Sequence, residues 1–214
     1  MKRRELVLAT ATVGAISGCL RSSGVRTDGS DDHHSDSDGD SDGDDHRSRP
    51  PFDVSTVDAP GSEAGTISVP IDEYVLLLNF TRTECPTSEE MIATIREARD
   101  RLIEEYDGEK NIPVRFLSVV DPVLGLDPTA SELADWWDEH DGNWAVGVDD
   151  GGLLNEYYDV SGFPTTIAMA GDGSVHWRST HGTAPSNVVT GVRTALEAQS
   201  TEWGRDVDGP RRLR

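Results

Sequence analysis

The sequence predicts an α/β fold in three layers, a central mixed sheet with helices on both faces. Between residues 60 and 200, short apolar runs of strand length alternate with amphipathic stretches of helical period. This alternation favours parallel strands, because each connecting helix carries the chain back across a face of the sheet. A late pair of strand-like runs around Gly171-Asp172-Gly173 adds antiparallel pairing. A chain of 214 residues has room for one such domain and its extensions.

The first half of the domain is expected to hold a strand, a helix and a second strand. Residues 75–80 read Val-Leu-Leu-Leu-Asn-Phe, a continuous apolar run typical of a strand covered on both faces. Residues 114–120 form a similar run. Between them, a helix starting near Ser88 shows one apolar face, made of Met91, Ile92, Ile95, Ala98, Leu102, Ile103 and Tyr106.

The second half begins with a helix whose N-terminus is marked by Thr129 and Glu132, a capping-box pair. The elements expected after it are a strand at 144–148, a helix at 153–158, strands at 165–170 and 175–179, and a last helix from Pro185. The predicted element order is β-α-β-α-β-α-β-β-α.

The N-terminus has three features of an exported lipoprotein. The Arg3-Arg4 pair resembles a twin-arginine export signal. The weakly apolar run at residues 6–16 is too short to cross a bilayer core of roughly 30 Å and fits a signal-peptide core. The small residues before Cys19 resemble a lipobox. We therefore expect residues 1–18 to be a signal peptide and Cys19 to carry a lipid that anchors the chain on the extracytoplasmic face of the cell membrane.

Composition divides the rest of the chain into three segments. Residues 20–51 are nearly all Ser, Asp, Gly, His and Arg, which offer little apolar surface to offset the entropy cost of ordering. We therefore expect residues 19–59 to form a disordered acidic tether that starts at the lipidated cysteine. Residues 60–200 are expected to form the folded domain, and residues 201–214 a frayed tail.

The charge balance excludes one class of partner. The chain has 40 acidic and 19 basic residues, a formal net charge of −21, which repels phosphate backbones. We therefore expect no nucleic-acid partner. This acidic composition resembles that of proteins from salt-loving organisms, where salt screens the self-repulsion. The two cysteines, Cys19 and Cys85, exclude a disulfide framework and a zinc site of paired cysteines.

Cys85 is the strongest candidate for a reactive residue. It lies between the strand at 75–80 and the helix near Ser88, where unpaired amide groups and the helix dipole favour thiolate over thiol. The carboxylate of Glu84 would oppose that effect. The alternative is a buried, inert cysteine, which polar neighbours such as Thr83 argue against.

A first motif around this cysteine carries a resemblance to a known family. The strand-like run ends in Asn79-Phe80, and Cys85-Pro-Thr-Ser88 follows after a short turn. This arrangement resembles the membrane-anchored thioredoxin-like proteins of the TlpA and ResA type, whose site reads Cys-Pro-Pro-Cys. The resemblance implies a thioredoxin-like fold.

A second motif, in residues 158–166, resembles the other signature of that family. It contains Phe163-Pro164-Thr165, followed by the Gly-Asp-Gly turn. The resemblance implies a cis peptide bond before Pro164 and a tight turn that places Phe163, Pro164 and Thr165 beside Cys85. There the backbone of Phe163 would pair with an extended substrate peptide.

The main departure from the family is Ser88, which stands where the second cysteine is expected. The mature domain would then have one thiol and no internal disulfide, although the Ser88 hydroxyl could donate a hydrogen bond to the Cys85 thiolate. The expected function is action on extracytoplasmic protein thiols or disulfides through mixed disulfides at Cys85. The alternative is a non-catalytic module that binds a partner peptide in the same groove.

A competing resemblance points to copper delivery. Residues 80–86 read Phe-Thr-Arg-Thr-Glu-Cys-Pro, similar to the start of the Sco copper chaperones, which bind copper through two cysteines and a histidine. The second cysteine of that motif falls at Glu89, and Phe163-Pro164 occupy the place of the histidine. His176 and His181 come later and are expected to be solvated. We therefore expect no metal and no other cofactor.

Overall fold

The computed structural model describes residues 49–106, 108, 112–123 and 126–206. The chain divides into two units, Met1–Ser41 and Asp42–Arg214, and every described residue belongs to the second. The predicted signal peptide, Cys19 and the predicted tether up to residue 48 lie outside the described residues. Among the described residues, no helix is both long and apolar enough to cross a bilayer.

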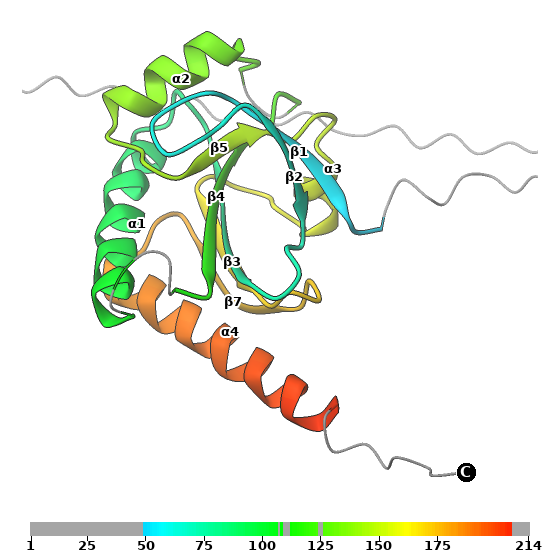
Figure 1. Ribbon diagram of the computed structural model, residues 1–214. Coiled ribbons are helices and arrows are strands. Elements are labelled where there is room, and N and C mark those ends of the chain that lie inside the picture. The colour runs from blue at the N-terminus through cyan, green and yellow to red at the C-terminus, as the bar shows by residue number, and fades with distance from the viewer. Residues whose placement is uncertain (1–48, 107, 109–111, 124–125, 207–214) are drawn as a thin grey trace, which may run out of the picture. The chain divides into compact units, whose positions relative to one another are not determined.

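Seven strands form one mixed sheet in the order β2-β1-β5-β4-β3-β6-β7. Neighbours β3, β4 and β5 run parallel, and the other pairs are antiparallel. The strands are β1 Phe52–Thr56, β2 Gly65–Val69, β3 Val75–Thr81, β4 Val114–Val120, β5 Ala145–Val148, β6 Thr165–Met169 and β7 Val175–Thr180. The helices are α1 Pro86–Glu105, α2 Ala130–Glu139, α3 Leu153–Tyr157 and α4 Pro185–Asp206 (Figure 1).

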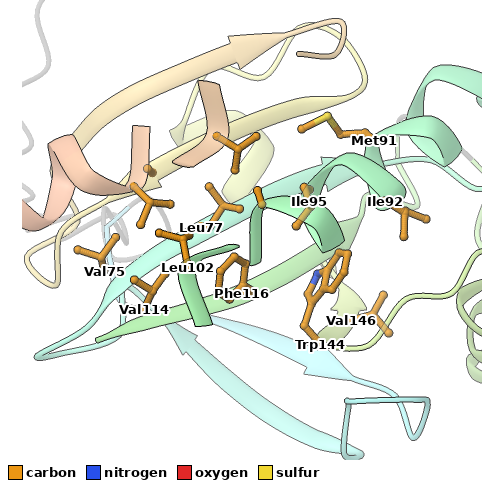
Figure 2. Packing of buried hydrophobic residues seen from close by; sticks show 14 of the residues in the cluster. Val75, Leu77, Met91, Ile92, Ile95, Leu102, Val114, Phe116, Trp144 and Val146 are labelled. Carbon is orange, nitrogen blue, oxygen red and sulfur yellow. The ribbon is translucent and has the colours of Figure 1, made fainter. Parts of the chain in front are cut away.

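Two apolar clusters cover the two faces of the sheet and confirm the predicted three layers. Val75 and Leu77 of β3 belong to the cluster that also takes residues from α1, α2 and α4 (Figure 2). Leu76 and Leu78 belong to the other cluster, which takes Leu154 from α3. Because successive side chains of a strand point to opposite faces, burial on both sides explains why β3 is apolar throughout residues 75–78 and again at Phe80.

The predicted elements are present, with small shifts at their ends. α1 begins at Pro86 rather than near Ser88, because Cys85 is its N-cap and proline suits the first helical position. α2 begins as predicted, since Thr129 and Glu132 form both hydrogen bonds of a capping box. The hairpin of β6 and β7 is also confirmed.

The boundary predicted at residue 60 is wrong, because β1 lies within the segment assigned to the tether. Phe52 and Val54 are almost fully buried and alternate with exposed residues, and β1 pairs with both β2 and β5. Five residues of period two are a weak signal beside a long polar tract, and β2 was missed for a similar reason. The other end also differs, since α4 continues to Asp206.

A chain of buried polar side chains crosses the middle of the sheet. The Thr166 hydroxyl donates to Asn79 Oδ1 at 3.0 Å, and Asn79 Nδ2 donates to the Ser118 hydroxyl at 3.3 Å. The indole N–H of Trp144 donates to the same hydroxyl at 3.0 Å. These contacts tie β6, β3, β4 and the start of β5 together just below the end of β3 that leads to Cys85.

Candidate functional site

Cys85 lies at the junction that the sequence predicts, between the end of β3 and the first turn of α1. Its backbone is extended, with φ −119° and ψ 109°, as is usual for an N-cap residue, and its carbonyl accepts the Glu89 amide at 3.0 Å. The thiol is partly exposed. Among the described residues it is the only cysteine, so the folded unit offers one sulfur for chemistry at this edge of the sheet.

The surroundings of Cys85 favour the thiolate. Partial burial is the largest single influence and raises the pKa of the thiol, but the hydroxyl and amide of Ser88, the amide of Thr87 and the charge of Arg82 act in the opposite sense. Together they hold the pKa of Cys85 below the usual value for a cysteine. Glu84, expected as an opposing charge, is exposed and is not among the influences on this pKa.

Ser88 is fully buried beneath this cysteine, and its hydroxyl has no hydrogen-bond partner that meets ordinary geometry. The same hydroxyl is nonetheless close enough to the sulfur to lower the pKa of Cys85. A neutral thiol is a poor acceptor, whereas a thiolate is a good one. A thiolate at Cys85 accepts this hydroxyl better than a thiol does, which links Ser88 to the ionised state of Cys85.

The loop before β6 lies beside the cysteine. The Phe163–Pro164 peptide bond is cis, as the family resemblance implies, and Pro164 is buried while Phe163 is half-buried. The Thr165 hydroxyl donates to the Gly162 carbonyl at 2.7 Å and so closes the turn. The backbone N–H and carbonyl of Phe163 make no hydrogen bond within the described part of the chain, which leaves them available to another peptide.

A hollow of about 560 Å³ joins these residues. Cys85 and Phe163 line it together, with Val120 at the end of β4 and Leu126 in the loop that follows. Arg82 forms another part of the wall, and its guanidinium lies over the Phe163 ring, 5.2 Å from the centroid. The hollow has the volume of small-molecule sites. Arg82 was not recognised from the sequence, because only the turn after β3 brings it to Phe163.

His181 is exposed, as expected of a loop residue, and it also lies close to this site. Its backbone N–H donates to the Pro164 carbonyl at 2.8 Å, and its φ of 64° is unusual for a residue other than glycine. A Cβ placed on Gly162 would lie 3.3 Å from its ring nitrogen Nε2. The register of β6 and β7, in which Thr165 faces Thr180, brings His181 here. His176, in β7, is partly buried.

Two buried carboxylates lie at the same edge of the sheet, after β4 and β5. Asp149 accepts the amides of Leu154 at 3.1 Å and Asn155 at 3.0 Å, so it caps α3. Burial raises the pKa of Asp149 most, the two amide bonds lower it, and the charges of Asp121 and Asp150 raise it further; the net shift is upward. In the described residues no group of three His, Cys, Asp or Glu side chains is placed to hold a metal ion.

Comparisons with known proteins agree with this fold. No protein-family model matches the sequence, and no curated protein is detectably similar to it. StoA from Bacillus subtilis matches with a TM-score of 0.52 and 15% identity, over 65% of this chain and 93% of that one. The exposed lipoprotein thioredoxin Etrx1 from Streptococcus pneumoniae matches with 0.50 and 19%, over 66% and 97%. A thioredoxin-like fold is therefore established.

A third solved structure is similar to this chain to about the same degree. The structure of a putative thioredoxin from Neisseria meningitidis has a TM-score of 0.50 and 16% identity, over 71% of this chain and 95% of that one. The chain thus spans an entire thioredoxin-like unit and carries, in addition, the N-terminal residues outside the described part.

Proposed function

We propose that this chain is an extracytoplasmic thioredoxin-like protein of the TlpA and ResA type, anchored to the membrane through Cys19, that acts on protein thiols and disulfides through Cys85 alone. The observation that carries the proposal is the position of Cys85 at the N-terminus of α1, in one hollow with Phe163, whose backbone groups make no hydrogen bond in the described part of the chain; the lowered pKa of the thiol agrees with it. A thiolate at a helix N-terminus is a nucleophile, and backbone N–H and carbonyl groups without partners beside it can form hydrogen bonds with a peptide.

The reaction has two stages, formation of a mixed disulfide at Cys85 and its resolution by thiols from outside the domain. The Cys85 thiolate attacks one sulfur of a partner's disulfide, which breaks that bond, forms a mixed disulfide and releases the second partner sulfur as a thiolate. Two thiolates from outside the domain then exchange in turn with the mixed disulfide: the remaining partner sulfur and the Cys85 sulfur leave as thiolates, and the two outside sulfurs become joined in a disulfide. Ser88 has no sulfur to perform this second attack, so the intermediate persists until an external thiol arrives. The unsatisfied Ser88 hydroxyl serves the first step by stabilising the attacking thiolate.

The membrane location rests on the N-terminal sequence. Arg3-Arg4, the short apolar run and Cys19 support export and lipidation. A structurally similar protein, Etrx1, is itself described as an exposed lipoprotein. A lipid at Cys19 would keep the thiol chemistry at the extracytoplasmic face of the cell membrane, where disulfides persist.

Trapping in native membranes tests the proposal. Cells that express the full chain, its Cys85→Ser variant or its Ser88→Ala variant are quenched with acid and an alkylating reagent, and adducts are identified by mass. Partners should be disulfide-linked to the wild type and absent from Cys85→Ser. Ser88→Ala, a matched control that keeps the sulfur, should yield fewer adducts of the same identity. Equal recovery from Cys85→Ser would contradict the proposal.

A second candidate is a binding module without covalent chemistry, which the free backbone of Phe163 favours. In that case the same partners would be recovered without a disulfide, and the Cys85→Ser variant would bind them as tightly as the wild type. Capture under non-reducing and reducing conditions therefore separates the two functions.

A further inference from the structure

The hollow beside Cys85 carries one positive and one negative side chain. Arg82 and Glu84 both line it, two residues apart, with the cysteine next to them. Among the described residues neither side chain makes an ion pair with a charged amino, guanidinium or carboxylate group; the guanidinium of Arg82 lies over the Phe163 ring, and its charge also favours the Cys85 thiolate. An unpaired cation and an unpaired anion that share one hollow suit a ligand that carries both charges.

The hollow also has the size and lining of a small-molecule site. Its volume of about 560 Å³ is within the range of such sites, and Val120, Leu126 and Phe163 provide apolar walls. The hydroxyl of Ser88 is fully buried and has no hydrogen-bond partner of ordinary geometry, and it lowers the pKa of Cys85, whose residue lines the hollow. Arg82, Glu84 and Cys85 thus line the same hollow.

We propose that this hollow binds a small zwitterionic thiol, of the class of cysteine and short cysteine-containing peptides. The Arg82 guanidinium holds the carboxylate, Glu84 holds the ammonium group, and the ligand sulfur meets Cys85. The inference rests on the proposed function, since it names the external thiol that a single-cysteine mechanism requires.

The proposed reaction consists of three successive thiol–disulfide exchanges. The Cys85 thiolate opens a partner disulfide and forms a mixed disulfide, leaving one partner thiolate. A bound small thiolate attacks the Cys85 sulfur, which releases the second partner thiolate and leaves the small thiol linked to Cys85. A second small thiolate then attacks the small-thiol sulfur, which frees Cys85 and forms the symmetric small disulfide. In total, two small thiols are oxidised and one partner disulfide is reduced.

The test measures how fast Cys85 reacts with four small disulfides that differ in charge. Cystine carries both charges on each half, cystamine only ammonium groups, 3,3′-dithiodipropionate only carboxylates, and 2-hydroxyethyl disulfide none. Rate constants for the full chain, followed by mass at Cys85, are divided by those of a free cysteine peptide to remove intrinsic differences. Each of these ratios is then divided by the ratio that the same variant gives with 2-hydroxyethyl disulfide. This second division removes any effect of the variant on the general reactivity of Cys85.

The wild type should prefer cystine roughly tenfold or more over each other probe, as expected for two charge-assisted contacts. The net charge of −21 would favour cationic cystamine everywhere on the surface, so preference for net-neutral cystine requires a local site. Arg82→Gln should lower the values for cystine and dithiodipropionate but not for cystamine. Glu84→Gln should lower those for cystine and cystamine but not for dithiodipropionate.

The outcomes distinguish this inference from the proposed function. If Cys85 reacts with all four disulfides at similar normalised rates, the zwitterion site is refuted while a reactive thiol remains. If Arg82→Gln and Glu84→Gln affect every charged probe alike, the assignment of the two charges is wrong. If Cys85 reacts with none of the four disulfides, both the site and the proposed thiol chemistry fail.

Discussion

At the scale of single residues, Cys85 owes its character to four groups of three neighbouring residues, Ser88, Thr87 and Arg82. The first-turn amides, the Ser88 hydroxyl and Arg82 together outweigh the cost of partial burial. The hydroxyl is the most informative of these, because it is buried and has no other partner. A serine at this place thus keeps the anion-stabilising role of the site while removing the second sulfur.

We expect Cys85 to titrate below the value of about 8.5 found for a free cysteine. Ser88→Ala should raise the pKa of Cys85, because the variant removes a hydrogen-bond donor to the thiolate and leaves the sulfur in place. The pKa of Cys85 in the wild type and in the variant is measured from the rate of alkylation at Cys85, detected by mass spectrometry at a series of pH values. A wild-type pKa at or above that of a cysteine peptide would contradict an activated nucleophile.

Ser88→Cys tests whether the missing sulfur limits the chemistry. Cys85 and residue 88 lie at the N-cap and in the first turn of α1, the spacing at which a dithiol pair closes at a helix start. A dithiol donor can serve the wild type only as an external resolving thiol, so the wild type should turn over insulin more slowly than Ser88→Cys, which should form a reversible internal disulfide. Comparable turnover by the wild type would mean that an external thiol already resolves the intermediate efficiently.

Asp149 makes stability depend on pH in an unusual direction. Burial, with help from Asp121 and Asp150, raises its pKa in the folded state above the unfolded value of about 3.9. Its favourable contribution is therefore complete below the unfolded pKa and is lost as pH rises through the folded pKa. Asp149→Asn should remove this loss, so the stability of the variant relative to wild type should increase between about pH 4 and neutrality.

Urea unfolding at a series of pH values in constant salt measures that difference. The variant also weakens the cap of α3, and the part of this loss that depends on ionisation is already contained in the net upward shift of the Asp149 pKa. The quantity to compare is therefore the slope, against pH, of the difference in free energy of unfolding between the variant and the wild type. A slope of zero, or one that falls with pH, would show that burial does not dominate the titration of Asp149.

At the scale of elements, β1 is the piece that the predicted domain boundary leaves out. It inserts between β2 and β5, and Phe52, Val54 and Val57 are buried in the apolar clusters. The Ser62 hydroxyl further fixes the β1–β2 connection, donating to the Val57 carbonyl at 2.8 Å and accepting the Val146 amide at 3.1 Å. β1 is therefore part of the core.

A chain that begins at residue 60 should be less stable than one that begins at residue 49. The shorter chain lacks β1 and exposes an edge of β5 together with apolar surface, a loss of at least about 3 kcal/mol, since truncating one buried Phe alone costs about that much. Urea unfolding of the two chains gives the difference directly. Equal unfolding midpoints and slopes for the two chains would show that the folded domain begins at residue 60.

At the scale of the whole molecule, the net charge of −21 opposes compactness through self-repulsion. Raising potassium chloride from about 0.1 M to 1 M shortens the screening length from about 10 Å to 3 Å. The free energy of unfolding should therefore rise with salt. Urea unfolding at fixed pH measures the change, and an unchanged or falling midpoint would show that repulsion is not a significant cost.

The sequence by itself determined the local features of this protein. The continuous apolar run of β3, the capping box of α2 and the Gly-Asp-Gly turn were predicted because each depends on residues adjacent along the chain. The placement of Cys85 between strand and helix, with Ser88 one turn later, was predictable for the same reason.

Only the tertiary structure decided which distant residues share the site. Arg82 meets Phe163, and His181 approaches Gly162, because the pairing of β3 with β6 and of β6 with β7 brings together segments some 20 to 80 residues apart. β1 was missed because its burial depends on a partner strand almost a hundred residues later, Ser55 facing Val148. Such contacts arise from sheet register and packing, which no local pattern of residues encodes.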